Sequence, residues 1–437
     1  MSIPVVTVGQ SQEDLVGGLE RLHGPVTVVR RCTELTELLA ACQSGLARAA
    51  VVAEGSQQLT ASLVDRLGAV GVAIIALTDS PEEAARLRGI GVSSALSGVE
   101  SAVLAARISD AVAQLTGTGS GHGRSFESGF ADTGAAFRPL PDTADPVPAA
   151  AGTGQIIAVW GPAGSPGRTL VAANIAGELA AEGKSVLLVD ADSYGASVAA
   201  VLGLLDEAAG LAQACRLADQ GILDQAALLR IATPVATKSG TFLVLTGITR
   251  ADRWTELRAT ALSLVLERAK EIADVVVVDT GFCLEADEEL SFDTMAPRRN
   301  AATLRSLELA DTVYAIGSAD PVGVPRLVRG LAELEAAVPH VSPLVVMNKV
   351  RAAAVGRTPE RQLREAWDRY GPASGITAFL PSDQAATDAA LLAGSLLLEA
   401  APESRIRGAI AALVCAPVQQ NRRSSVFSST AKRRLKG

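Results

Sequence analysis

The chain has 437 residues, of which 48% are hydrophobic, 20% charged and only 3% aromatic. This length suggests two or three domains, and so apolar a chain can bury a large core, which excludes the disordered and fibrous classes. The net charge of −8 argues against general binding of polyanions. The five cysteines lie far apart with no CxxC pair, which argues against a disulfide framework or a zinc site of the usual spacing.

The first residues lack the basic and then apolar pattern of a secretory signal. The longest apolar stretch, residues 389–401, is interrupted by Gly394, Ser395 and Glu399, so no membrane span is expected. We therefore expect a cytoplasmic protein.

Residues 1–115 alternate short apolar runs with helix-like segments. Strands are expected at residues 4–8, 26–29, 49–52, 72–77 and 92–96, with helices such as 33–43 and 59–67 between them. This alternation is typical of a parallel, doubly wound sheet.

The order and size of these elements resemble a response-regulator receiver domain, but its chemical residues are missing. Gly9-Gln10-Ser11 stands where receivers carry an acidic pair, and Glu54 stands near the position of their phosphorylated aspartate. No lysine follows the fifth strand, although Thr78 matches the usual hydroxyl of strand four. We therefore expect a receiver-like domain that acts through protein contacts and without phosphorylation.

Residues 116–153 are rich in Gly, Pro, Ser, Thr and Asp and predict a flexible linker. Residues 418–437 form a basic tail without acidic residues, for which we expect disorder. The tail lacks an apolar face, so a purely solvated segment is favoured, and weak contact with an anionic membrane or with nucleic acid is the alternative.

Residues 154–417 form the larger predicted domain. Strands are expected at residues 155–159, 185–189, 241–245, 274–278, 312–316 and 343–347, with helices such as 170–182 and 254–272 between them. The chain as a whole is therefore predicted to be an α/β protein with two doubly wound parallel-sheet domains joined by a flexible linker.

A glycine-rich segment, Gly161 to Thr169, lies between an expected strand and an expected helix. In this context glycines let backbone amides approach phosphate oxygens at the positive end of a helix. Thr169 stands where a hydroxyl would bind Mg²⁺, whereas Arg168 replaces the usual lysine and Pro162 replaces a glycine. On the loop alone, nucleotide binding and a purely structural glycine turn remain equal alternatives.

Carboxylates end two of the expected strands in this domain. Asp190 and Asp192 follow the second strand, and Asp279 ends the run Asp274-Val-Val-Val-Val in the manner of a Walker B strand, where the acid holds Mg²⁺ or its water. Either acid alone could simply cap a loop. The glycine-rich loop followed by these two acidic strand ends, three elements in this order, favours a P-loop NTPase.

At this point the sequence resembles the MinD/ParA class of deviant P-loop ATPases over residues 155–414. The resemblance includes the loop and its helix, Asp190-Ala-Asp192, Asp279, the segment around Asn348 and the closing segment around Pro381. It implies ATP and Mg²⁺ as cofactors, with Asn348 reading adenine and Asp192 polarising the attacking water. The metal ligands would be Thr169, Asp190 and Asp279. The nucleotide-binding residues that it implies are Gly161, Gly164, Ser165, Pro166, Gly167, Arg168, Thr169, Leu170, Asn348 and Pro381.

Within this class, a receiver-like N-terminal domain resembles the CpaE/TadZ branch, which positions pilus or tight-adherence secretion machinery. The resemblance implies a homodimer through the ATPase domain, secretion or pilus proteins as partners, and a polar or peripheral inner-membrane location. Ala163 stands where the class has its signature lysine. We therefore expect an ATP-binding localisation factor with weak or no hydrolysis. The alternatives are an active partition or septum-site ATPase and a nucleotide-free scaffold.

Overall fold

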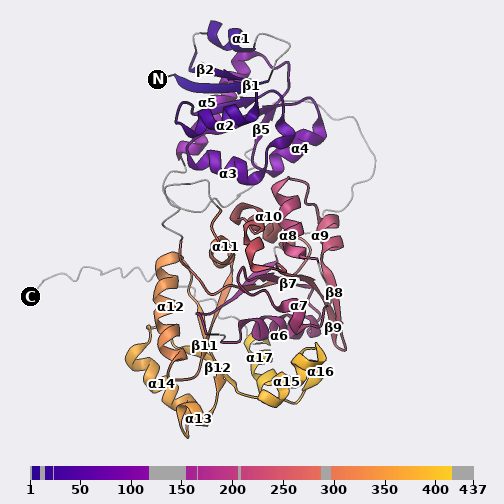
Figure 1. The fold of residues 1–437 in the computed structure, drawn as a ribbon, viewed down its shortest axis with the longest axis vertical. Helices are drawn as coiled ribbons and strands as arrows, with labels where there is room; N and C mark the ends of the chain where they lie inside the picture. Colours follow the sequence, from indigo (N-terminus) through magenta and orange to yellow (C-terminus); the bar gives the residue numbers. More distant parts are fainter. Residues whose placement is uncertain are drawn as a thin grey trace, which may run out of the picture.

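The computed structural model describes residues 2–9, 15–22, 24–117, 154–164, 166–204, 208–286 and 297–415. In these ranges the chain forms two α/β domains, each built around its own sheet (Figure 1). The expected fold class is therefore confirmed. Nearly all of the expected linker, residues 118–153, and the whole of the expected tail, residues 418–437, lie outside the described residues.

The first domain contains a five-stranded parallel sheet in the order β2-β1-β3-β4-β5. This is the flavodoxin-like doubly wound order. Its strands are β1 (Ile3–Val8), β2 (Val26–Cys32), β3 (Ala49–Val52), β4 (Ala73–Leu77) and β5 (Ser93–Ala95). Its helices are α1 (Leu15–Arg21), α2 (Leu35–Gln43), the short 3-10 helix η1 (Ser56–Gln58), α3 (Ala61–Ala69), α4 (Pro81–Gly89) and α5 (Ser101–Gly117).

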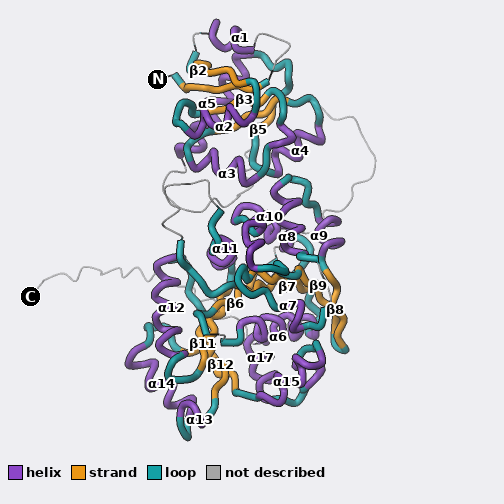
Figure 2. The backbone as a smooth tube through the Cα atoms, in the orientation of Figure 1, coloured by secondary structure: helices purple, strands orange, loops and turns teal. Residues whose placement is uncertain are grey.

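Helices cover both faces of this first sheet (Figure 2). Side chains such as Val6 and Val8 pack under α2, α3 and α4, whereas Val5 faces α1 and α5. At the carboxyl ends of β1 and β3, Gly9 has a φ of +96° and lies so close to Glu54 that an added Cβ would be 2.7 Å from the Glu54 backbone nitrogen. A side chain at position 9 would therefore clash with Glu54, so this position requires glycine.

The second domain contains an eight-stranded sheet in the order β13-β12-β11-β6-β10-β7-β9-β8. All its pairings are parallel except that of β8 with β9. Its strands are β6 (Gln155–Trp160), β7 (Val186–Ala191), β8 (Thr233–Thr237), β9 (Gly240–Leu245), β10 (Val275–Thr280), β11 (Thr312–Ser318), β12 (Leu344–Val350) and β13 (Ile376–Pro381).

The helices of the second domain form a layer on each face of its sheet. They are α6 (Arg168–Ala181), α7 (Val198–Val201), α8 (Gly210–Asp219), α9 (Gln225–Ile231), the 3-10 helix η2 (Ala251–Glu256), α10 (Ala259–Lys270), α11 (Ala301–Leu309), α12 (Gly323–Ala337), α13 (Ala352–Val355), α14 (Pro359–Tyr370), α15 (Gln384–Ala393), α16 (Leu397–Ala400) and α17 (Arg405–Cys415). Val277 faces the layer of α6 and α15 to α17, and its neighbour Val278 faces α8 and α10. This alternation explains why the first four residues of β10, residues 275–278, are all apolar.

One expectation for this domain was wrong in detail, and one strand was not expected. The expected helix over residues 254–272 is two elements, η2 and α10, because Leu257 leaves helical geometry and turns its side chain into the core. The strand that was not expected is the antiparallel edge strand β8, which is joined to β9 by the two-residue turn Lys238-Ser239. Pro234 fits this strand because an edge strand has a free side that needs no amide donor.

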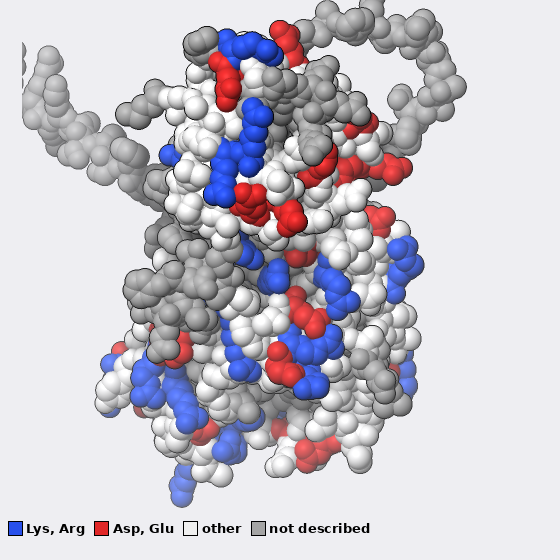
Figure 3. Space-filling view, turned by 45° about the horizontal axis from the view of Figure 1, so that its top comes forward, with Lys and Arg blue, Asp and Glu red and all other residues white. Residues whose placement is uncertain are grey.

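The two domains touch where α3 lies against α8 and α10 (Figure 1). The Ser62 amide donates to Asp219 Oδ1 at 2.8 Å, and Arg86 Nη1 donates to the Gln220 carbonyl at 2.9 Å. Acidic and basic side chains are interspersed over both domains on the face shown in Figure 3. Among the described helices, none combines the length and the apolar character needed to cross a bilayer.

The helix that carries the loop residues, α6, is tied to α17 by a bidentate ion pair. Arg407 donates to both carboxylate oxygens of Glu178, at 2.7 and 2.8 Å, and the Glu178 side chain is only 5% exposed. Arg407→Ala should therefore lower the free energy of unfolding by about 2 kcal/mol, because it leaves a buried carboxylate unpaired. Urea denaturation would measure this loss. Arg405→Ala, on the exposed side of the same helix, is the control, and equal losses in both variants would contradict the prediction.

Candidate functional site

The glycine-rich loop joins the end of β6 to the start of α6. Gly164 and Gly167 have φ values of +111° and +97°, a conformation that favours glycine, and Gly167 is the N-cap of α6. The backbone therefore turns sharply and presents the first amides of a long helix to the carboxyl edge of the sheet. Ser165, one of the expected binding residues, lies outside the described residues.

The loop begins in the crevice between β6 and β11. A Cβ at Gly161 would lie 2.3 Å from the Ile316 carbonyl oxygen, so only glycine allows this approach. On one side of β6 lie β10, β7 and β9, and on the other lie β11, β12 and β13. In doubly wound proteins, ligands bind at such a switch point of strand order.

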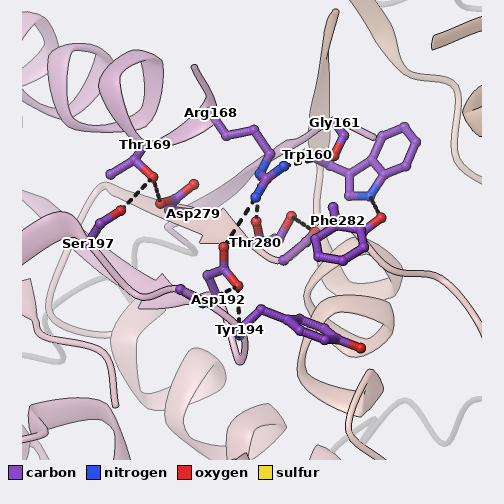
Figure 4. Close-up of polar contacts among 12 residues, drawn as sticks. Trp160, Gly161, Arg168, Thr169, Asp192, Tyr194, Ser197, Asp279, Thr280 and Phe282 are labelled. Carbon is purple, nitrogen blue, oxygen red and sulfur yellow. Dashed lines mark hydrogen bonds and ion pairs between the residues drawn. The ribbon is translucent and has the colours of Figure 1, made fainter. Parts of the chain in front are cut away.

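Thr169 and Asp279 form a hydroxyl–carboxylate pair at the start of α6. Thr169 Oγ1 donates to Asp279 Oδ2 at 2.6 Å and lies 3.2 Å from Ser197 Oγ (Figure 4). Asp279 is 1% exposed, and its other oxygen, Oδ1, has no hydrogen-bond partner among the described residues. A buried carboxylate oxygen without a donor beside two hydroxyls fits a hard cation such as Mg²⁺.

Asp190 lies directly beside Asp279 because β7 and β10 pair in register there. Asp190 accepts from the Val198 amide at 2.9 Å and from the Asp192 amide at 3.3 Å. Burial, with a further contribution from the charge of Asp192, raises the pKa of Asp190 to about 6. Burial and the neighbouring Asp190 also raise the pKa of Asp279 well above its usual range. The two carboxylates therefore compete for protons or for a cation.

Arg168 points from the start of α6 into the protein, toward the ends of β6, β7 and β10 (Figure 4). It donates at 3.1 Å in each case to the Thr280 carbonyl, the Gly161 carbonyl and Asp192 Oδ2. Asp192 Oδ1 accepts from the amides of Tyr194 and Gly195 at 2.8 and 3.1 Å. Arg168 therefore forms an ion pair with Asp192, the carboxylate expected to polarise the attacking water.

Asn348, on β12, lies against the loop at Gly167. Its Nδ2 donates to the Pro166 carbonyl at 2.7 Å, its Oδ1 accepts from the Lys349 amide at 2.8 Å, and the residue is 2% exposed. Pro381 lines a separate hollow of about 650 Å³ at the carboxyl ends of β12 and β13. Leu170 is half-buried on α6. Asn348 therefore stabilises the loop through its hydrogen bond to Pro166, whereas Pro381 faces the hollow.

An aromatic cluster beside Asp192 was not expected from the sequence. Arg299 stacks 4.0 Å from the centroid of the Tyr194 ring, which lies 4.8 Å from that of Phe282. The Trp160 indole donates to the Phe282 carbonyl at 3.3 Å, and Trp160 is 1% exposed. The only feature of the sequence that could have indicated this cluster is that Tyr194 comes two residues after Asp192. The cluster fixes the segment after Asp192 against the end of β6.

The carboxylates do not form a dedicated metal cage. Among the described residues there is no group of three or more His, Cys, Asp or Glu side chains that could hold a metal ion. This fits Mg²⁺ in a nucleotide site, where one or two protein groups and phosphate oxygens share the ion. The expected ligands Thr169, Asp190 and Asp279 are brought together at one point of the sheet edge.

Comparison with known proteins gives one sequence match. Residues 152–221, which include the loop and Asp192, match a family model described as ParA, the NUBPL iron-transfer P-loop NTPase. No curated protein matches the chain.

Several solved structures are similar to part of this chain. The cell division ATPase MinD of Pyrococcus furiosus is 20% identical, with 60% of this chain and 97% of that chain covered and a TM-score of 0.45. A ParA family ATPase from Chlorobium tepidum TLS is 17% identical, with 60% and 99% covered and a TM-score of 0.49. The septum site-determining protein MinD with Mg-ADP from Pyrococcus horikoshii OT3 is 18% identical, with 60% and 94% covered and a TM-score of 0.45.

The buried carboxylate of Asp279 should make the protein less stable at higher pH when no divalent cation is present. A carboxyl whose folded-state pKa is raised favours folding in acid, and this contribution is lost as the pH rises through the raised pKa. Asp279→Asn should therefore raise the Tm at pH 8 and change it much less at pH 5. Thermal unfolding in EDTA would measure both values.

Asp274, near the other end of the same strand, provides the matched control. Hydrogen bonds from the side chain and backbone of Ser185 lower its pKa, so its charge contributes stability above its usual pKa. Asp274→Asn should lower the Tm at pH 8. If both variants moved the Tm in the same direction at pH 8, the assignment of Asp279 as a strained buried charge would be wrong.

Proposed function

We propose that this chain is an ATP-binding, dimerising localisation factor of the MinD/ParA type, with weak or no hydrolysis. The observation that carries the proposal is the hydrogen bond of 2.6 Å from Thr169 Oγ1 to Asp279 Oδ2. It lies next to a loop that presents the first amides of α6 at the switch point of the strand order. The match of residues 152–221 to the ParA family model supports the same assignment.

In this proposal the loop from Gly161 to Thr169 binds the phosphates through its amides. Thr169 and Asp279 would hold Mg²⁺, which when bound neutralises phosphate charge, and Asp190 would support it from the adjacent strand. The hollow of about 650 Å³ beside Pro381 is large enough for a purine base. Asn348 has to give up its bond to Pro166 in order to read that base.

We expect slow hydrolysis because the described part of the loop has no free cationic side chain beside the phosphates. Phosphoryl transfer needs cations placed against the transferring oxygens. Arg168 is committed to two carbonyls and to Asp192, and Ala163 carries no charge. The proposed site therefore binds a triphosphate better than it stabilises the transition state.

The localisation role is proposed from the two-domain organisation and from the resemblance to the CpaE/TadZ branch. The first domain has a five-stranded sheet in the flavodoxin-like order, and Gly9 packs closely against Glu54 at the carboxyl ends of β1 and β3. These features support a docking function without phosphorylation. In this proposal ATP closes a homodimer through the second domain, and the first domain recruits secretion or pilus proteins at a pole or at the inner membrane.

A nucleotide-free scaffold is the second candidate, and the contacts of Arg168 are the observation that favours it. With three acceptors inside the protein, this guanidinium ties the loop to the ends of β7 and β10. Such a loop is fixed without a ligand. Nucleotide titration separates the two candidates.

Thr169→Ala should weaken binding of a fluorescent ATP analogue about tenfold with Mg²⁺ and little in EDTA, because it removes a metal ligand and leaves the loop amides in place. Thr169→Ser keeps the hydroxyl and is the control. Size-exclusion chromatography of the wild type with a non-hydrolysable analogue should show the dimer. Failure of the wild type to bind the analogue at all would favour the scaffold.

Turnover by the unmodified protein should be very slow, and restoring both lysines with Ala163→Lys and Arg168→Lys should raise it. One missing electrostatic contact typically costs about a hundredfold to a thousandfold in rate. Release of inorganic phosphate would be measured for the wild type, for each single variant and for the double variant. Rapid release by the wild type that Asp192→Ala abolishes would instead support an active partition ATPase.

A further inference from the structure

A small cavity of about 160 Å³ adjoins the glycine-rich loop. One wall is the loop itself, at Ala163, Gly164 and Pro166, and the other is the start of α12 with Arg326. The cavity thus combines loop backbone with a guanidinium from a helix that follows β11, which lies next to β6 in the sheet.

Arg326 lies directly against the backbone of the loop. A Cβ at Gly164 would be 2.6 Å from Arg326 Nη1, so the guanidinium occupies the space over this glycine. Arg326 is exposed, and its side chain makes no hydrogen bond or ion pair with any residue that the structure describes. Its donors are therefore available to an anion in the cavity.

The acidic residue in the cavity wall does not neutralise this arginine. Asp320 Oδ1 accepts from the amides of Val322 and Gly323 at 2.9 and 2.7 Å, and Oδ2 accepts from Ser318 Oγ at 2.5 Å. Asp320 thereby caps the chain as it enters α12. Both oxygens are thus held by local donors, and Asp320 makes no ion pair with Arg326, so the donors of the guanidinium stay free.

Within the described part of the loop, no charged residue faces this cavity. Arg168 turns to Thr280, Gly161 and Asp192, and Ala163 is uncharged. A phosphate chain on the loop would therefore meet Arg326 as its cation from the α12 side.

We propose that Arg326 is a phosphate-binding residue, which contacts an outer phosphate of a nucleoside triphosphate held on the loop of the same chain. This inference rests on the proposed nucleotide binding and assigns part of it to a helix outside the sequence motifs. Loss of this charge-assisted hydrogen bond should lower the affinity about tenfold, which corresponds to about 1.4 kcal/mol.

The test is titration of the full chain with fluorescent ATP and ADP analogues in Mg²⁺. Arg326→Ala should weaken ATP binding about tenfold and ADP binding less, and Arg326→Lys should retain most of the affinity because it keeps the charge. Arg329→Ala, one turn further along α12 and outside the cavity wall, should bind like the wild type. Raising the salt concentration should shrink the difference between the wild type and Arg326→Ala, because the lost contact is an exposed charge.

Folding is not expected to obscure this result, since Arg326 is exposed and its side chain makes no hydrogen bond or ion pair with a described residue. Equal Tm values for both alanine variants would check it. Equal ATP affinity of Arg326→Ala and Arg329→Ala would overturn the inference while leaving nucleotide binding intact. Tighter binding by Arg326→Ala would also overturn it, because the guanidinium would then block the cavity. Absence of binding by the wild type would remove the proposed function and the inference together.

Discussion

The organisation of the second domain depends on two carboxylates buried side by side. Asp190 and Asp279 end neighbouring strands in register, each 1% exposed, in the most apolar part of the sheet. Unpaired buried charges are costly, so the surroundings must supply donors or a cation. The Thr169 hydroxyl and the Val198 amide supply part of the compensation, and the oxygen left unpartnered on Asp279 defines where a cation would complete it. The same hydrogen bond from Thr169 ties the start of α6 to the end of β10.

Much of this arrangement could be predicted from sequence because it is local. Continuous apolar runs ending in Asp predict buried parallel strands. The ends of adjacent parallel strands meet at one edge, which explains why Asp279 and Asp190 lie side by side. The antiparallel strand β8 was missed because an edge strand with a half-exposed pattern and Pro234 gives little periodic signal. The break at Leu257 was missed because its cause is burial against the core, which depends on tertiary packing.

The directions of the arginines could not be predicted. A sequence motif places Arg168 in the loop, but whether its guanidinium faces phosphate or protein is decided by the carbonyls of Gly161 and Thr280. Arg326 has no motif at all, and it reaches Gly164 only because β11 lies next to β6 in the sheet. Charges that arrive from distant segments are visible only after the strand order is known.

The position of Trp160 has a practical consequence. This buried indole immediately precedes Gly161, donates to the Phe282 carbonyl, and packs so near Gly330 of α12 that a Cβ there would lie 3.0 Å from the ring. Indole emission changes with local polarity and with quenching by neighbouring groups. The chain has only three tryptophans, and the other two, Trp254 and Trp367, belong to η2 and α14. A displacement of the loop or of α12 should therefore change the intrinsic fluorescence of Trp160, so that the movement can be followed without a label.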